Sequence, residues 1–247
     1  MRTRNRSRRW ALGVPVVLVL VAVVVVALLY SNRDNRTPAT ASTSTSSLLV
    51  VTWGPSLCSV ERSNPGCRSG HVKGLGPTLI LHGLWPQPTS EQYCPLPSGQ
   101  RDLPSLQLPA DLTDDLQSKM SDVGIMAPHE WKTHGSCSGV SATEYFRVSS
   151  TLAEQAGAIL DPVFRTADGR VTIEAIRAAL DAGLSAGAGK RVMLICRDTD
   201  RGPLAYEVRL SLPSVADLAQ VPDVSLRDVI AKGPTLSGGC RRGSVPR

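Results

Sequence analysis

Two short segments concentrate the residue types that carry out acid–base chemistry. The first, His82-Gly83-Leu84-Trp85-Pro86, directly follows an apolar run, and the second is His129-Glu130-Trp131-Lys132-Thr133-His134-Gly135-Ser136-Cys137. Imidazole titrates near neutral pH, so one histidine can accept a proton while another donates one. Two imidazoles and a carboxylate this close together indicate a site at which charge develops during a reaction.

A metal site is the obvious alternative for the second segment. Zinc proteases place two histidines four residues apart on one helix face, with the pattern HExxH. Here His129 and His134 are five residues apart, which is roughly 140° around a regular helix. Two ligands so placed cannot share one ion, so we expect no metal. Nor do we expect a Ser-His-Asp hydrolase, whose serine sits in a G-x-S-x-G elbow.

Periodicity predicts the elements that position these segments. Strands are predicted over residues 48–53, 78–81, 191–196 and 204–212, and helices over 112–120, 141–159 and 172–182, with another starting near 128. His82 would then lie at a strand end, and residues 54–77 would be loop. In 204–212 apolar residues alternate with Glu207 and Arg209, which is typical of a half-buried strand. The predicted class is α+β, with helices packed on a central, mostly antiparallel sheet.

The N-terminal region predicts export. Residues 1–9 carry five arginines, and residues 10–30 are uncharged and apolar. About 20 such residues cross a bilayer, so we expect a transmembrane signal anchor with its basic end in the cytoplasm. A cleaved signal peptide is the competing interpretation, and it would release a secreted protein. Residues 31–47 read as a disordered Ser/Thr linker, and residues 48–247 as the catalytic domain.

Charge and cysteines constrain that domain. Seven of the 27 basic residues and one of the 21 acidic residues precede residue 48, which leaves 20 of each in the remainder. Any nucleic-acid site must therefore come from a local cluster of charge. All six cysteines lie between residues 58 and 240, in no Cys-x-x-Cys pair. In an exported chain this favours disulfides over zinc, and 15 pairings are open.

The combination HGLWP and HEW-x-x-HG-x-C resembles the two active-site segments of the ribonuclease T2 family. VTWGPSLC at residues 51–58 is similar to the opening strand and first cysteine of that family, and the later cysteines fit in order. The resemblance covers roughly residues 48–240. It implies an endoribonuclease that cleaves single-stranded RNA, but not DNA, by 2′-hydroxyl attack. The products would be a 2′,3′-cyclic phosphate and then a 3′-phosphate, formed without metal or cofactor.

The resemblance also implies roles for single residues. His134 resembles the general base and His82 the general acid, although the sequence leaves the order of these two open. Glu130 resembles the assisting carboxylate, His129 the phosphate-binding histidine and Trp85 a residue of the base pocket. Tyr93 is a looser candidate for base stacking. The implied disulfides are Cys94–Cys137, Cys196–Cys240 and Cys58–Cys67, and we expect a monomer.

One position departs from the family pattern. The family usually has lysine immediately before the second histidine, where this chain has Thr133, and Lys132 stands one residue earlier. On a helix this moves the charge by about 100°. We expect the flexible Lys132 side chain to help bind the phosphate. The alternatives are a weakly active or inactive RNA-binding protein and a membrane-tethered interaction domain that uses the fold only as a scaffold.

Overall fold

The computed structural model describes residues 42–88, 94 and 105–246 of the chain. The chain divides into two compact units, residues 1–38 and 39–247, and all described residues belong to the second. The predicted basic segment, the predicted transmembrane segment 10–30 and most of the predicted linker therefore lie outside the described residues. Within the described ranges, no helix is both long enough and apolar enough to span a membrane.

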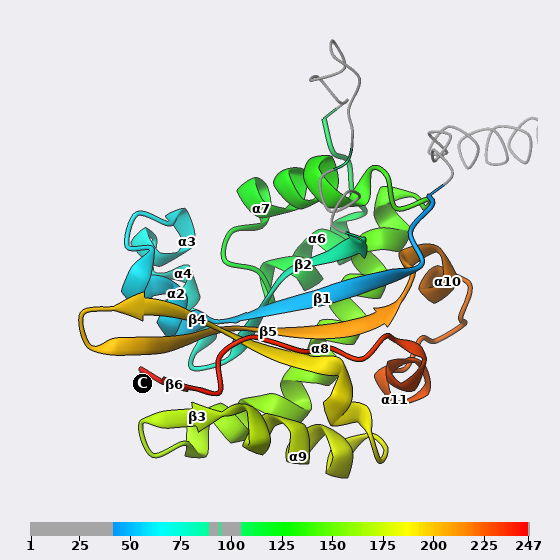
Figure 1. Cartoon of the computed structure of the whole chain (residues 1–247). Coiled ribbons are helices and arrows are strands. Elements are labelled where there is room, and N and C mark those ends of the chain that lie inside the picture. Colours follow the sequence, from blue (N-terminus) through cyan, green and yellow to red (C-terminus); the bar gives the residue numbers. More distant parts are fainter. Residues whose placement is uncertain (1–41, 89–93, 95–104, 247) are drawn as a thin grey trace, which may run out of the picture. The chain divides into compact units, whose positions relative to one another are not determined.

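A six-stranded sheet forms the centre of the described unit (Figure 1). In chain order its strands are β1 (Ser46–Trp53), β2 (Leu79–Gln87), β3 (Arg170–Thr172), β4 (Val192–Thr199), β5 (Gly202–Pro213) and β6 (Arg242–Ser244). β1 lies between β2 and β5 and is antiparallel to both, and β4 extends the sheet beyond β5. β6 pairs antiparallel with β3 but parallel with β5. The predicted α+β class and the mostly antiparallel sheet are confirmed.

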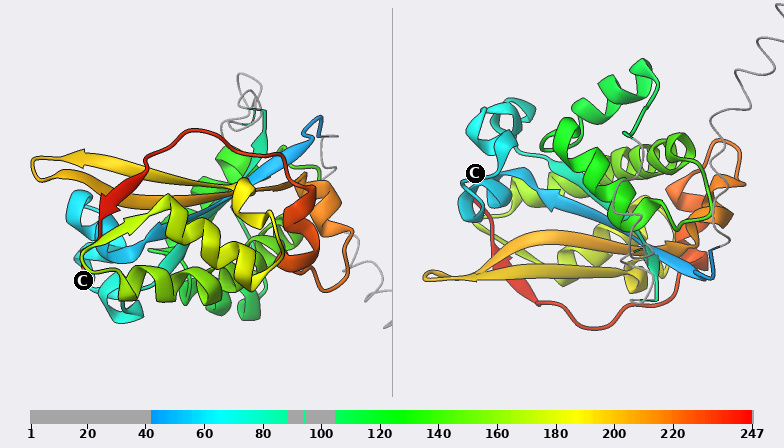
Figure 2. Two further views of the ribbon diagram at one scale, coloured as in Figure 1. Left: turned by 60° about the horizontal axis from the view of Figure 1, so that its bottom comes forward. Right: turned by 90° about the horizontal axis from the view of Figure 1, so that it is seen from above.

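Helices cover this sheet and connect its strands. Their bounds are α2 (Gly54–Val60), α3 (Pro65–Arg68), α4 (His71–Leu75), α6 (Ala110–Gln117), α7 (Val123–Glu130), α8 (Ala142–Thr166), α9 (Ile173–Gly183), α10 (Val215–Ala219) and α11 (Leu226–Val229). Two short 3-10 segments, Ala188–Arg191 and Ile230–Lys232, follow α9 and α11. Figure 2 shows α8 and α9 together along one face of the sheet.

The long helix α8 begins at the predicted capping box. The Ser141 hydroxyl accepts from the Glu144 N–H, and the Glu144 carboxylate accepts from the Ser141 N–H at 2.9 Å. A cap of this kind stabilises a helix by about 1 kcal/mol. One face of α8 then buries Tyr145, Phe146 and Phe164 against the sheet. The helix is thus the platform on which β2 rests.

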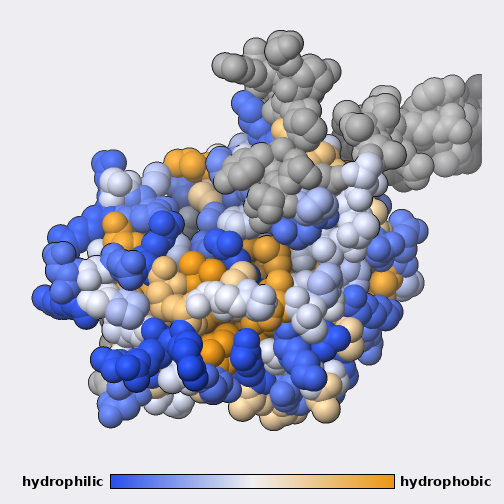
Figure 3. Space-filling view, viewed as in Figure 1, coloured by the Kyte–Doolittle hydropathy of each residue, from blue (hydrophilic) through white to orange (hydrophobic). Residues whose placement is uncertain are grey.

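The core lies between this helix and the strands. Trp53 at the end of β1 is 1% exposed and stacks on Phe164, with 4.9 Å between ring centroids. The buried Asp161 carboxylate on α8 accepts from the Leu79 N–H at 2.8 Å, which attaches the start of β2 to the helix. Figure 3 shows apolar side chains gathered in the middle of one face, over the sheet, with hydrophilic side chains around them. The site described below is therefore built on a rigid support.

The structure corrects three of the predicted elements. Residues 54–77 are not plain loop but contain α2, α3 and α4, and prolines occupy the first turns of α2 and α3, where a missing N–H costs nothing. β2 continues to Gln87 instead of ending at Leu81, so His82 lies inside a strand. β1 begins at Ser46, so the last two residues of the predicted linker belong to the sheet.

The helix predicted to start near residue 128 begins earlier. Asp122 caps α7 by accepting from the Ile125 N–H, and Pro128 lies inside that helix instead of in its first turn. After Glu130 the coil widens into a π-helical turn, Trp131–Gly135, closed by the Ser136 N–H donating to the Trp131 carbonyl at 2.7 Å. Such π turns are rare and are frequent at functional sites.

Candidate active site

His82 projects from an irregularity in the sheet. In the pairing of β1 with β2, Val50 lies opposite Gly83 while Val51 lies opposite Leu81, so His82 is the extra residue of a β-bulge. Bulges locally twist a strand and change the direction of a side chain. The His82 side chain is 27% exposed, and its two nitrogens face carboxylates from two different elements. A regular strand would give this histidine one ordinary cross-strand neighbour.

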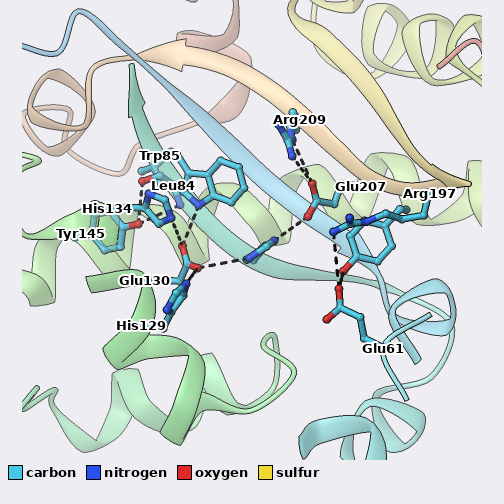
Figure 4. A network of polar contacts seen from close by, with 12 residues as sticks. Glu61, Leu84, Trp85, His129, Glu130, His134, Tyr145, Arg197, Glu207 and Arg209 are labelled. Carbon is cyan, nitrogen blue, oxygen red and sulfur yellow. Dashed lines mark hydrogen bonds and ion pairs between the residues drawn. The ribbon is translucent and has the colours of Figure 1, made fainter. Parts of the chain in front are cut away.

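Glu130, the last residue of α7, is the centre of the site (Figure 4). Its side chain is completely buried, and its Oε2 accepts from Trp85 Nε1 at 2.9 Å. Its Oε1 lies 3.6 Å from His82 Nε2, and its Oε2 lies 3.8 Å from His134 Nε2. One carboxylate therefore stands between the two imidazoles that the sequence predicts as acid and base.

Gly83 makes room for this carboxylate. A Cβ atom at position 83 would lie 1.9 Å from Glu130 Oε2 and 2.7 Å from Trp85 Nε1. Because glycine has no Cβ, it permits this close approach of the Glu130 side chain. Next to it, the Tyr145 hydroxyl donates to the Leu84 carbonyl at 2.8 Å and accepts from the Leu84 N–H, which fixes the backbone at this point.

The π turn brings His129 and His134 together. His129 and His134 have ring centroids 6.4 Å apart in an edge-to-face arrangement, and His129 Nε2 lies 3.9 Å from Glu130 Oε1. The His134 side chain is 5% exposed, whereas that of His129 is 57% exposed. His134 is thus fixed inside the site while His129 lines its open side.

This geometry overturns the argument made from a regular helix against metal. The widened turn brings residues five apart close to one face, and ligand atoms of His129, Glu130 and His134 all lie within 4.8 Å of one another. On distance alone these three side chains could hold a metal ion. They are also the three side chains to which the resemblance gives roles in phosphate binding and catalysis, so we treat them as part of the catalytic site.

A buried ion pair on β5 completes the cluster, and the sequence analysis missed it. Glu207 Oε1 lies 2.9 Å from His82 Nδ1, and Glu207 Oε2 accepts from Arg209 at 2.8 Å and 3.2 Å. The alternation in β5 had suggested a half-buried strand with these residues on its polar side. β5 instead lies between β1 and β4 in the sheet, and Glu207 is only 3% exposed. Charged residues in a central strand are the signal that could have identified them, because buried charges are paired.

Burial and neighbouring charges set the protonation of the site. Burial raises the pKa of Glu130 to about 7, against the opposing effects of His82 and the Trp85 hydrogen bond. Burial acts to lower the pKa of His82, but the Glu207 hydrogen bond and the charges of Glu130 and Glu207 outweigh it and raise that pKa. Burial and the nearby His82 lower the pKa of His129. Near neutral pH the cluster therefore holds groups poised on both sides of a proton transfer.

The other predicted binding residues, Trp85, Lys132 and Tyr93, have three different outcomes. Trp85 lies in the cluster: its ring stacks on His134 with 4.9 Å between centroids, and the Arg209 guanidinium lies 5.0 Å from its ring centroid. Lys132 is exposed on the π turn. Tyr93 lies outside the described residues. The structure thus joins Trp85 directly to the acid–base groups.

Disulfides support the site. The structure contains Cys58–Cys67, Cys94–Cys137 and Cys196–Cys240, so the three implied pairings are present. Cys94 also donates its backbone N–H to the Thr133 carbonyl at 2.7 Å. The segment around Cys94 is thereby attached to the π turn that carries His134.

The residues around Ser185 match the nucleophile pattern of serine hydrolases but not its structural setting. One G-x-S-x-G sequence does occur, at residues 183–187. It begins at the last residue of α9 and leads into the 3-10 segment Ala188–Arg191, whereas a nucleophile elbow joins a strand to a helix. The segment is therefore no such elbow.

Comparisons with known proteins identify relatives of the chain. A model of the Ribonuclease T2 family matches residues 45–219. The chain is 28% identical over 177 residues to Ribonuclease MC of Momordica charantia, covering 65% of this chain and 84% of that one. It is also 28% identical over 110 residues to a ribonuclease of Aeromonas hydrophila, covering 43% of this chain and 44% of the relative, so it spans less than half the length of that protein.

A solved structure shares the fold. The crystal structure of RNase NT in complex with 5′-AMP is similar with a TM-score of 0.53 and 18% identity, over 83% of this chain and 99% of that chain. At that identity the likeness concerns the fold alone. The family match and the ribonuclease relatives support a ribonuclease. The match covers well over half of the sequence, and the chain belongs to the ribonuclease T2 family.

Proposed function

We propose that the domain is an endoribonuclease that cleaves single-stranded RNA through a 2′,3′-cyclic phosphate to 3′-phosphate ends. The observation that carries this proposal is the arrangement of His82 and His134 on either side of the buried Glu130 carboxylate, 3.6 Å and 3.8 Å from its two oxygens. An acid and a base that flank one point suit a reaction in which one oxygen of the phosphate loses a proton as another gains one.

In the proposed reaction His134 removes the proton from the ribose 2′-hydroxyl. The 2′-oxygen attacks phosphorus, and the bond to the 5′-oxygen breaks as His82 gives that oxygen a proton. Water then opens the cyclic phosphate with the two histidines in exchanged roles. The order is supported by Glu207: a carboxylate only accepts, so it holds a proton on His82 Nδ1 and favours the doubly protonated ring that an acid requires.

Glu130 and His129 would contact the phosphate. With its pKa near 7, Glu130 is partly protonated at neutral pH, and a neutral carboxyl can donate a hydrogen bond to a phosphate oxygen. An ionised carboxylate in the same place would repel the developing negative charge, which nearby cations stabilise. His129 on the open side is placed to meet the phosphate from solvent.

A direct assay tests the proposal. The full chain, purified under oxidising conditions in mild detergent, is incubated in EDTA with single-stranded RNA and with DNA of the same sequence, beside His82→Ala and His134→Ala. We expect cyclic-phosphate ends from RNA, intact DNA, and no cleavage by either variant. DNA lacks the 2′-hydroxyl nucleophile and should resist. Loss of activity in EDTA would contradict the metal-free mechanism.

The second candidate is a catalytically weak or inactive RNA-binding protein. Thr133 favours it, because family members usually have lysine at this position. In this chain the lysine, Lys132, is exposed and stands one residue earlier. The same assay separates the two: folded protein that retains RNA on a filter and leaves it intact would support binding without cleavage.

We also propose that the domain works outside the cytoplasm, anchored by residues 10–30. The three disulfides support an oxidising compartment. Protease added to intact cells should remove the domain while a cytoplasmic marker survives. Recovery of the chain from the medium, trimmed after residue 30, would instead support a cleaved signal peptide.

A further inference from the structure

We propose that Glu207 is a positioning residue for the general acid, holding the His82 ring in place and protonated at Nδ1, and that Arg209 in turn fixes Glu207. The inference rests on the proposed function, because it concerns how His82 acts in that reaction. It extends the His82–Glu207 contact, used above to assign the acid, to a role for the whole buried Glu207–Arg209 ion pair.

The contacts form a continuous chain (Figure 4). Arg209 donates through Nε and Nη2 to Glu207 Oε2, at 3.2 Å and 2.8 Å, and His82 Nδ1 lies 2.9 Å from Glu207 Oε1. The other ring nitrogen of His82, Nε2, lies 3.6 Å from Glu130 Oε1. Glu207 therefore holds the side of the imidazole away from the reaction and directs Nε2 to the catalytic carboxylate.

The sheet register explains how this pair comes to lie beside His82. β1 separates β2 from β5, with Glu207 opposite Thr52 and Arg209 opposite Val50, and Gly83 of β2 lies opposite Val50 from the other side. Directly paired residues point to the same face of a sheet. Glu207 thus reaches His82 across β1, and the bulge at His82 supplies the displacement that brings the ring to it.

Charge makes the contact effective. Burial acts to raise the pKa of Glu207, but the contacts with His82 and Arg209 outweigh it and lower that pKa, so the group is an ionised acceptor. The charged groups around His82 are Glu130 and His129 on α7 and Glu207 and Arg209 on β5. Two of them are carboxylates, and of the described side chains only Glu207 lies within hydrogen-bond distance of the ring.

This arrangement makes Glu207→Gln a sharp probe. Arg209 can only donate, so it will bind the amide oxygen and turn the amide NH2 toward His82 Nδ1. Nδ1 must then accept and cannot carry a proton. The ring volume and packing are preserved while the doubly protonated, acidic form of His82 is disfavoured.

Two substrates distinguish positioning of an acid from general damage. In a dinucleotide the leaving 5′-oxygen needs a proton, whereas in the matching nucleoside 3′-(4-nitrophenyl phosphate) nitrophenolate leaves unprotonated. The full chain and its variants are assayed on both. For Glu207→Gln we expect kcat/KM on the dinucleotide to fall by about tenfold to a hundredfold. This loss is smaller than the whole contribution of a general acid to the rate, which is about 10²–10⁴-fold. On the aryl ester it should change by less than about threefold, as His82→Ala also should.

The outcomes separate cleanly. The alkaline limb of the kcat/KM profile for the dinucleotide should move to lower pH in Glu207→Gln, because the acid loses its proton more readily. Arg209→Gln keeps the carboxylate and should show a smaller loss of the same kind. The control is Glu61→Gln: Glu61 is half-exposed and accepts a hydrogen bond from Tyr206, the neighbour of Glu207 in the chain, and this variant should show no loss. Equal losses on both substrates, or an unchanged dinucleotide rate, would overturn the proposal. Wild-type protein inactive on both would refute the proposed function instead.

Discussion

Replacing Glu130 with glutamine should make the protein more stable at alkaline pH while it reduces activity. The carboxylate is completely buried, and its pKa is about 7 instead of the ordinary 4.5. The folded state then binds this proton more tightly than the unfolded state, so the free energy of unfolding falls as pH rises through that interval. At about 1.36 kcal/mol per pH unit, the full difference is about 3 kcal/mol.

The assay is urea unfolding of the wild type and Glu130→Gln at pH 5 and pH 8, with disulfides intact. Comparing the two proteins at each pH removes the contributions of other titrating groups to a first approximation. We expect the variant to gain about 2–3 kcal/mol relative to wild type between pH 5 and pH 8. Glu61→Gln, 43% exposed, controls for removing a negative charge and should gain far less. A constant difference between Glu130→Gln and wild type at both pH values would refute the reasoning.

Three further substitutions probe the support of the site. In Gly83→Ala a Cβ 1.9 Å from Glu130 Oε2 must displace the carboxylate, so kcat/KM for RNA should fall at least about tenfold with an unchanged circular dichroism spectrum, and full activity would contradict the packing. Thr133→Lys should raise kcat/KM about tenfold if a cation is missing at the phosphate, and no gain would indicate that Lys132 already acts there. Cys94→Ser with Cys137→Ser opens a loop of separation 43, and urea unfolding should show a loss of roughly 4 kcal/mol, whereas a loss below about 1 kcal/mol would contradict the chain-entropy account.

Much of the site could be predicted because its chemistry lies in two contiguous segments. His82 and Gly83 fall in one, and Glu130 and His134 in the other, and residues four apart near a helix meet on one face. The capping box of α8 and the alternation of β5 are equally local. Local patterns of this kind do not depend on the rest of the fold, so the sequence alone predicts them.

What could not be predicted is set by contacts distant in sequence. Glu207 lies 125 residues from His82 and reaches it only through the order β2-β1-β5. The alternation in β5 suggested a polar side in solvent, because periodicity shows that two faces differ and not that both are covered. The bulge at His82 and the π turn after Glu130 likewise change side-chain directions without a sequence signature of their own.

Both irregularities place histidines beside the buried Glu130 carboxyl. Glu130 is buried among rings, and its Oε1 has no hydrogen-bond donor among the described residues. An unpaired buried oxygen is destabilising, and structures retain one when other contacts hold it in place. Here Gly83 gives it space, Trp85 holds its other oxygen, and the β2 backbone is fixed by Tyr145. When this carboxyl is protonated, it can donate a hydrogen bond, and in the proposed reaction a phosphate oxygen accepts it. The same buried carboxyl thus lowers the stability of the fold and, in the proposed reaction, binds the phosphate.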